Sequence, residues 1–148
     1  MRLRAGTTLL LCALLVPVAG CAPKATGTGA FTKVVYEVRG GVAGFDRHFA
    51  IAADGAYSVR DRGRPDRAGT LPAADVRLLR AAIAKADWSA VAGAYVEPRM
   101  ADALIETVTL TVAGREYQVV VGSGVIPPAQ VQPALDLLRR VLTDRLAK

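Results

Sequence analysis

The segment that decides the fold reads LIETVTLTVAGREYQVVV and spans residues 104–121. Over residues 104–113, leucine, glutamate and valine alternate with isoleucine and threonine, a period-2 pattern rich in β-branched side chains and typical of a strand with one apolar face. Ala-Gly-Arg at residues 113–115 supplies a turn, and residues 116–121 alternate again. We therefore predict that the two halves form an antiparallel hairpin.

Three further strands are predicted upstream of this hairpin. Residues 33–39 place two valines and a tyrosine on one face of a period-2 pattern. Residues 45–53 and 56–62 are also extended, and the Asp54-Gly55 pair between them is a strong signal for a two-residue hairpin turn.

Two helices complete the pattern. Residues 72–86 carry apolar side chains at helical spacing, with basic side chains on the opposite side, and Pro72 suits a first turn. Residues 60–67 before this helix mix arginine, aspartate, glycine and proline, which predicts a solvated loop. The last helix begins near Pro133 and docks through a leucine stripe. The stripe consists of Leu135, Leu138, Leu142 and Leu146.

The element order is therefore β-β-β-α-β-β-α. Hairpins and separated helices favour the α+β class, with an antiparallel sheet of about five strands and two helices packed on one face. A doubly wound α/β fold is not expected, because no βαβ rhythm occurs. We assign one domain to residues 31–148, since the whole chain has only 148 residues.

The first twenty residues have the composition of a signal peptide. Arg2 and Arg4 form a basic head before an apolar run at residues 9–19, which is too short to span a bilayer. The run ends in Val-Ala-Gly-Cys, which resembles the lipobox of bacterial lipoproteins. That resemblance implies cleavage between Gly20 and Cys21 and a diacylglycerol thioether on Cys21; an ordinary secreted signal peptide cut elsewhere is the alternative.

Residues 22–30 are small and polar without periodicity, as expected of a flexible tether. A coil of this length reaches only about 15 Å, so the domain should sit close to the membrane. We expect an exported protein, lipid-anchored to the cell membrane and facing outside the cytoplasm. Because Cys12 lies in the signal segment, the folded domain would contain no thiol.

Composition excludes several classes of function. The chain carries 19 basic and 13 acidic side chains, a net charge of +6, but two arginines belong to the signal segment. The remaining basic residues are dispersed and lack interleaved aromatics, so no nucleic-acid partner is expected. Two cysteines and one histidine are too few for a zinc site, and no metal or cofactor is predicted.

No constellation of catalytic residues is evident. His48, the one imidazole, falls within a predicted strand, and Ser123 lies in Gly-Ser-Gly before a proline pair rather than in a nucleophile elbow. Glu97, Asp102 and Glu106 are near one another in sequence, but nothing places two of them across a cleft. Phosphate-binding glycine motifs are absent from the sequence. We therefore predict a protein that is not an enzyme.

A glycine-rich string, Gly-Gly-Val-Ala-Gly at residues 40–44, lies between the first two predicted strands. Three glycines in five residues permit positive φ angles and a close approach by another backbone. The string is either a wide hairpin turn or an exposed loop that docks into the groove of a partner, with Val42 and Phe45 as candidate apolar tips. The candidate partner-binding residues are Gly40, Gly41, Val42, Ala43, Gly44 and Phe45.

Several short motifs together resemble the emfourin family, small proteinaceous inhibitors of protealysin-like metallopeptidases. They are the glycine string after a strand, the helix end Ala86-Asp87-Trp88, Asp102 before a threonine-rich strand, Gly114-Arg115, and the step from Gly124 to Pro127 into a leucine helix. The similarity runs from about Lys33 to Leu146. Departures are the lipoprotein signal, the extended loop at residues 60–67, and Val42 at a position where an aromatic residue is expected.

The resemblance implies an α+β inhibitor domain without catalytic residues or cofactor. It also implies a secreted zinc metallopeptidase as the partner, bound through the glycine string and the surface near Asp102. The alternative is an envelope lipoprotein that serves envelope assembly or binds a small ligand. That alternative predicts an apolar pocket between sheet and helices rather than a protruding loop.

Overall fold

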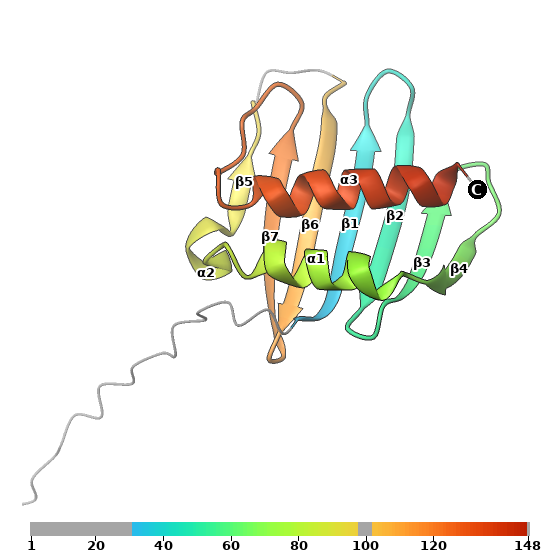
Figure 1. Ribbon diagram of the computed structural model, residues 1–148. Helices are drawn as coiled ribbons and strands as arrows, with labels where there is room; N and C mark the ends of the chain where they lie inside the picture. Colours follow the sequence, from blue (N-terminus) through green and yellow to red (C-terminus); the bar gives the residue numbers. More distant parts are fainter. Residues whose placement is uncertain (1–30, 98–101, 148) are drawn as a thin grey trace, which may run out of the picture.

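The computed structural model describes residues 31–97 and 102–147. These residues form a seven-stranded sheet with three helices, of the α+β class (Figure 1). The elements are β1 (Phe31–Gly40), β2 (Phe45–Ala52), β3 (Ala56–Asp61), β4 (Arg67–Thr70), α1 (Ala73–Ile83), α2 (Trp88–Val91), β5 (Gly93–Tyr95), β6 (Leu104–Val112), β7 (Arg115–Gly122) and α3 (Gln132–Leu146).

The hairpin expected from residues 104–121 is confirmed as β6 and β7. The two strands pair antiparallel, with Val108 opposite Val119 on the buried face. Their turn places Ala113 at φ +49° and Gly114 at φ +75°. Positive φ at both central residues matches the right-handed twist of the flanking strands, which explains why so short a connection suffices.

The number and order of elements differ from the expectation of about five antiparallel strands and two helices. The sheet order is β4-β3-β2-β1-β6-β7-β5, and β5 pairs parallel to β7, so the sheet is mixed. β4 and β5 have four and three residues and lie at the two edges. Such segments are too short to show a period-2 pattern, so the sequence alone does not mark them as strands.

The short helix α2 was not predicted from the sequence. It has four residues, and the Asp87 carboxylate caps it by accepting hydrogen bonds from the backbone N–H groups of Ser89 at 3.1 Å and Ala90 at 3.3 Å. Its Trp88 is buried, and the Trp88 indole N–H donates to the Ile83 carbonyl at 2.9 Å. The cap and the buried indole therefore define a separate short helix where the sequence suggested only the end of α1.

One hydrophobic core lies between the sheet and the helices. α1 and α3 lie side by side across one face of the sheet (Figure 1). Val34, Tyr36 and Val38 of β1 point into this core, as the alternation predicted. Three members of the leucine stripe on α3 are fully enclosed, and each contributes about 2 to 3 kcal/mol by burial. They are Leu135, Leu138 and Leu142.

The sheet has two distinct ends. β1 begins at Phe31 and ends at Gly40, and at about 3.3 Å per residue these positions lie about 30 Å apart. The end with Phe31, which also carries the β2–β3 and β6–β7 turns, is called the entry end below. The end with Gly40, which carries the β1–β2 turn and the start of β6, is called the loop end.

Candidate functional site

The glycine string forms a protruding turn at the loop end. Gly40 pairs with Phe45, and residues 41–44 make the turn, which is closed by a hydrogen bond from the Gly44 N–H to the Gly41 carbonyl at 2.9 Å. The side chain of Val42 is 96% exposed at its tip. A valine with almost no contact surface within its own domain is available to a partner.

A second segment is bonded to this turn and brings Asp102 beside it. The Gly41 N–H donates to the Ala103 carbonyl at 3.2 Å. A Cβ atom on Gly40 would stand 2.5 Å from the same oxygen, so only glycine fits there. Asp102 precedes Ala103, is exposed, and has a positive φ of 57°. Residues 40–45 and Asp102, predicted separately as partner-binding, therefore lie at one end of the sheet.

Phe45 does not behave as an apolar tip, which corrects that expectation. Its side chain is half-buried and packs against the core, because Phe45 shares its face of β2 with the buried Phe49. The Arg47 guanidinium lies 4.5 Å from the centre of the Phe45 ring, and Arg47 is itself paired with Asp61 at 3.3 Å. These contacts hold the ring at the root of the turn and leave Val42 as its exposed tip.

A third segment, the connection from β7 to α3, completes the loop end. The Ser123 N–H donates to the Leu104 carbonyl at 2.8 Å, and the Leu104 N–H donates to the Ser123 hydroxyl at 3.3 Å. Three residues later Ile126 is 82% exposed. Sequence reasoning treated this connection only as a turn; the available signal was an isoleucine outside every periodic segment, next to a proline pair.

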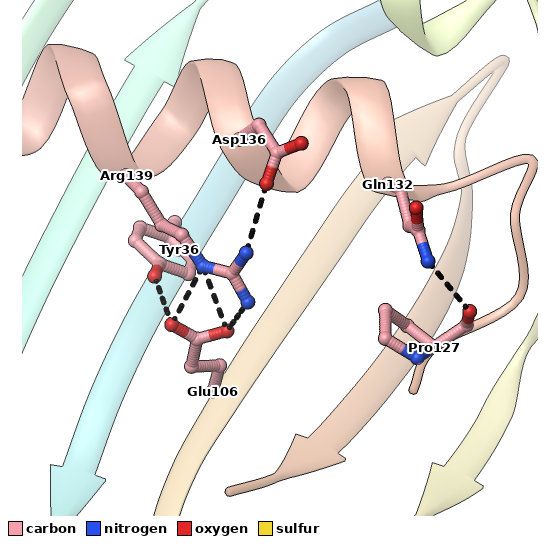
Figure 2. Close-up of polar contacts among 6 residues, drawn as sticks. All are labelled: Tyr36, Glu106, Pro127, Gln132, Asp136 and Arg139. Atoms are coloured by element: carbon pink, nitrogen blue, oxygen red, sulfur yellow. Dashed lines mark hydrogen bonds and ion pairs between the residues drawn. The ribbon is translucent and has the colours of Figure 1, made fainter. Parts of the chain in front are cut away.

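A small cleft opens between this connection and α3. It has a volume of about 200 Å³ and is lined by the strand ends of β6 and β7, the turn after β7, and Arg139. Figure 2 shows that Arg139 reaches down from α3 to Glu106 on β6. The Arg139 Nε lies 3.0 and 3.1 Å from the two carboxylate oxygens of Glu106, and Arg139 Nη2 also bonds Glu106 Oε2.

Two further groups fix this ion pair. The Tyr36 hydroxyl donates to Glu106 Oε1 at 2.8 Å, and Arg139 Nη1 donates to Asp136 at 2.9 Å (Figure 2). Burial raises the pKa of the Tyr36 hydroxyl well above its usual value, and the negative Glu106 raises it further. Hydrogen bonds to Glu106 raise the pKa of Arg139. Tyr36 therefore keeps its proton and donates to Glu106 at neutral pH, and the network ties β1 and β6 to α3.

His48 and Ser123, two of the residues considered for catalysis, are not brought together. His48 lies on β2, on the face away from the helices, whereas Ser123 follows β7. Because β1 and β6 lie between those strands, the two residues are separated by about 14 Å or more. Glu106 is engaged by Arg139 and Tyr36. Among the described residues, no group of three or more histidine, cysteine, aspartate or glutamate side chains is placed to hold a metal ion.

The predicted signal peptide, Cys21 and the predicted tether at residues 22–30 lie outside the described residues. Within residues 31–97 and 102–147, no helix is both long and apolar enough to cross a bilayer. Comparison with known proteins found no family model and no curated protein that matches this chain. The resemblance to the emfourin family therefore rests on the sequence motifs alone.

Proposed function

We propose that this protein is an exported, lipid-anchored binding module without catalytic residues, which inhibits a secreted metallopeptidase through its loop end. The observation that carries the proposal is the exposed Val42, presented on a turn whose base is fixed by the bond from Gly41 to Ala103. A tip held rigidly before binding loses little conformational entropy when it enters a groove. The motif resemblance supplies the class of partner.

A lipid on Cys21 would also orient the domain so that the loop end faces a partner in solution. Cys21 precedes Phe31 by ten residues, so a lipid on Cys21 would hold the entry end against the membrane. The loop end is about 30 Å further along β1 and would face away from the lipid surface. An anchored inhibitor needs this arrangement, because its target approaches from the aqueous side.

The proposal is tested by titrating a protealysin-type or thermolysin-type peptidase with the protein and with Gly41→Val. Gly41 has a φ of +71°, and a Cβ there would lie 3.4 Å from Leu104 Cδ1; the valine side chain would strain the backbone and obstruct backbone approach by a partner. Gly114→Val is the matched control: Gly114 has a similar φ of +75°, an added Cβ there would meet nothing within 4 Å beyond its chain neighbours, and the residue lies at the entry end. We expect inhibition at micromolar concentration, weakened by Gly41→Val and retained by Gly114→Val.

A second candidate function is binding of a small polar ligand, serving the envelope without inhibition. The cleft of about 200 Å³ favours it, because the charged Arg139 and Glu106 line one wall. The expected apolar pocket between sheet and helices is instead occupied by core side chains such as Leu110 and Leu138. Arg139→Ala should abolish ligand binding while leaving inhibition through Val42 intact, which separates the two candidates.

A further inference from the structure

A second cleft with charged side chains lies at the entry end, whereas Val42 lies at the loop end. It is a cleft of about 580 Å³ between the β2–β3 turn and α1, called the entry cleft below. Arg77 and Arg80 of α1 line it together with Asp54 and Thr70. Both arginines are exposed.

Hydrogen bonds connect the entry cleft to the place where the tether joins the domain. Arg80 Nη2 donates to the Ala53 carbonyl at 2.7 Å. The Ala53 N–H in turn donates to the Thr32 carbonyl at 3.0 Å. Thr32 follows Phe31, the first described residue. The entry cleft is thus held next to the point from which residues 22–30 lead back to Cys21.

The balance of charge around the cleft is positive. Within the described residues Arg77 forms no ion pair, and the Asp54 carboxylate is partly satisfied by the Ala56 N–H at 2.9 Å. Asp75, on the first turn of α1, is paired with Arg145 at 3.5 Å. The same end of the sheet also carries two exposed basic side chains and one exposed acidic one. These are Lys33, Arg115 and Glu116.

We propose that the entry cleft contacts the anionic phosphodiester headgroups of the membrane that holds the lipid anchor. Guanidinium groups form paired hydrogen bonds with phosphate oxygens, and basic side chains near an anionic lipid surface are attracted to it. The inference rests on the anchoring part of the proposed function, because a coil of residues 22–30 spans only about 15 Å on average and would bring the entry end close to the membrane. Contact there would turn the loop end outward.

The test uses a chain that begins at residue 21 and carries Cys21→Ser, which removes the lipid and keeps every described residue. Its partition onto vesicles of phosphatidylcholine with 30% phosphatidylglycerol is compared with pure phosphatidylcholine. We expect clear preference for the anionic vesicles, about a five-fold loss with Arg77→Ala, and about 25-fold with Arg77→Ala and Arg80→Ala together. Circular dichroism verifies that both variants fold.

Arg62→Ala is the matched control, since it removes the same charge at the loop end, where Arg62 lies beside Gly44. Equal losses for Arg62→Ala and Arg77→Ala would overturn the site, as would absent binding to anionic vesicles. Tight binding of inorganic phosphate at matched ionic strength, without vesicle preference, would also overturn it in favour of a small-anion site. Because the tested chain has no lipid and no peptidase is present, failure here leaves lipidation and inhibition separately testable.

Discussion

The carbonyl oxygen of Ala103 lies against both Gly40 and Gly41. It accepts a hydrogen bond from the Gly41 N–H, and a Cβ atom added to Gly40 would lie only 2.5 Å from it. Two segments more than 60 residues apart in the sequence are therefore locked together at the base of the exposed turn. This contact makes the loop end a fixed surface rather than two independent loops, and it is directly open to mutation.

Gly40→Ala should destabilise the domain by about 3 kcal/mol. The residue has a φ of +85°, which costs about 1 to 2 kcal/mol for alanine, and the new methyl group would collide with the Ala103 carbonyl. Gly114→Ala, with φ +75° and open space, should cost only about 1 kcal/mol. Urea unfolding measures both. Equal losses would show that the contact with Ala103 relaxes without cost.

Tyr36→Phe should lower the free energy of unfolding by about 1 to 2 kcal/mol at neutral pH, because Glu106 loses a hydrogen-bond donor. The difference in unfolding free energy between wild type and Tyr36→Phe should become smaller above pH 10. An unfolded tyrosine releases its proton near pH 10, whereas burial and Glu106 hold the native Tyr36 protonated, so the wild type loses up to about 1.4 kcal/mol per pH unit there. The phenylalanine variant lacks this loss. Parallel stability curves from pH 8 to 11 would contradict this assignment.

Arg139→Ala should destabilise the domain by about 2 kcal/mol, since it leaves the Glu106 carboxylate, only 13% exposed, without its cation. The loss is smaller than for a fully buried pair because Arg139 is 42% exposed. Arg140→Ala, at the adjacent exposed position on α3, should change stability by less than about 0.5 kcal/mol. Thermal unfolding of the two variants measures this difference. Equal losses of stability would show that the ion pair with Glu106 adds nothing beyond the loss of one positive charge from α3.

Cys21→Ser should release the protein from the membrane fraction and remove the lipid mass from the mature chain. Two acyl chains provide stable anchoring, whereas the described domain has no spanning helix. Cys12→Ser changes the other cysteine, which lies in the proposed signal segment, and should leave partition unchanged. Retention of Cys21→Ser in the membrane with an unaltered mass would refute lipidation at this position.

The long strands and helices could be predicted because each buries one face continuously. Val34, Tyr36 and Val38 alternate into the core as their spacing indicated, and the leucines of α3 follow the helical period. β4 and β5 could not be predicted, since they are too short to show an alternation and depend on a longer neighbouring strand for their backbone pairing. Gly69 illustrates this dependence: a Cβ there would stand 2.9 Å from the Tyr57 hydroxyl oxygen of β3.

The candidate site was predictable in part. The glycine string indicated an exposed turn, but its bond to Ala103 depends on sheet order, which no local pattern specifies. Glu106 occupies a core-facing position in the alternation of β6, so a partner for its charge was to be expected. That the partners are Tyr36 and Arg139 follows only from the placement of β1 and α3 around β6.

Inhibition through the exposed turn is tested by the inhibition constant of Val42→Asp, relative to wild type, against a protealysin-type peptidase. Val42 makes almost no contact within its own domain, so a carboxylate there should leave stability unchanged. It should raise the inhibition constant at least ten-fold if this tip is buried by the target. Leu78→Asp, at a position on α1 that is 49% exposed, is the control and should leave the inhibition constant unchanged. An unchanged inhibition constant for Val42→Asp would rule out binding through Val42, and no inhibition by the wild type at micromolar concentration would rule out the inhibitor function.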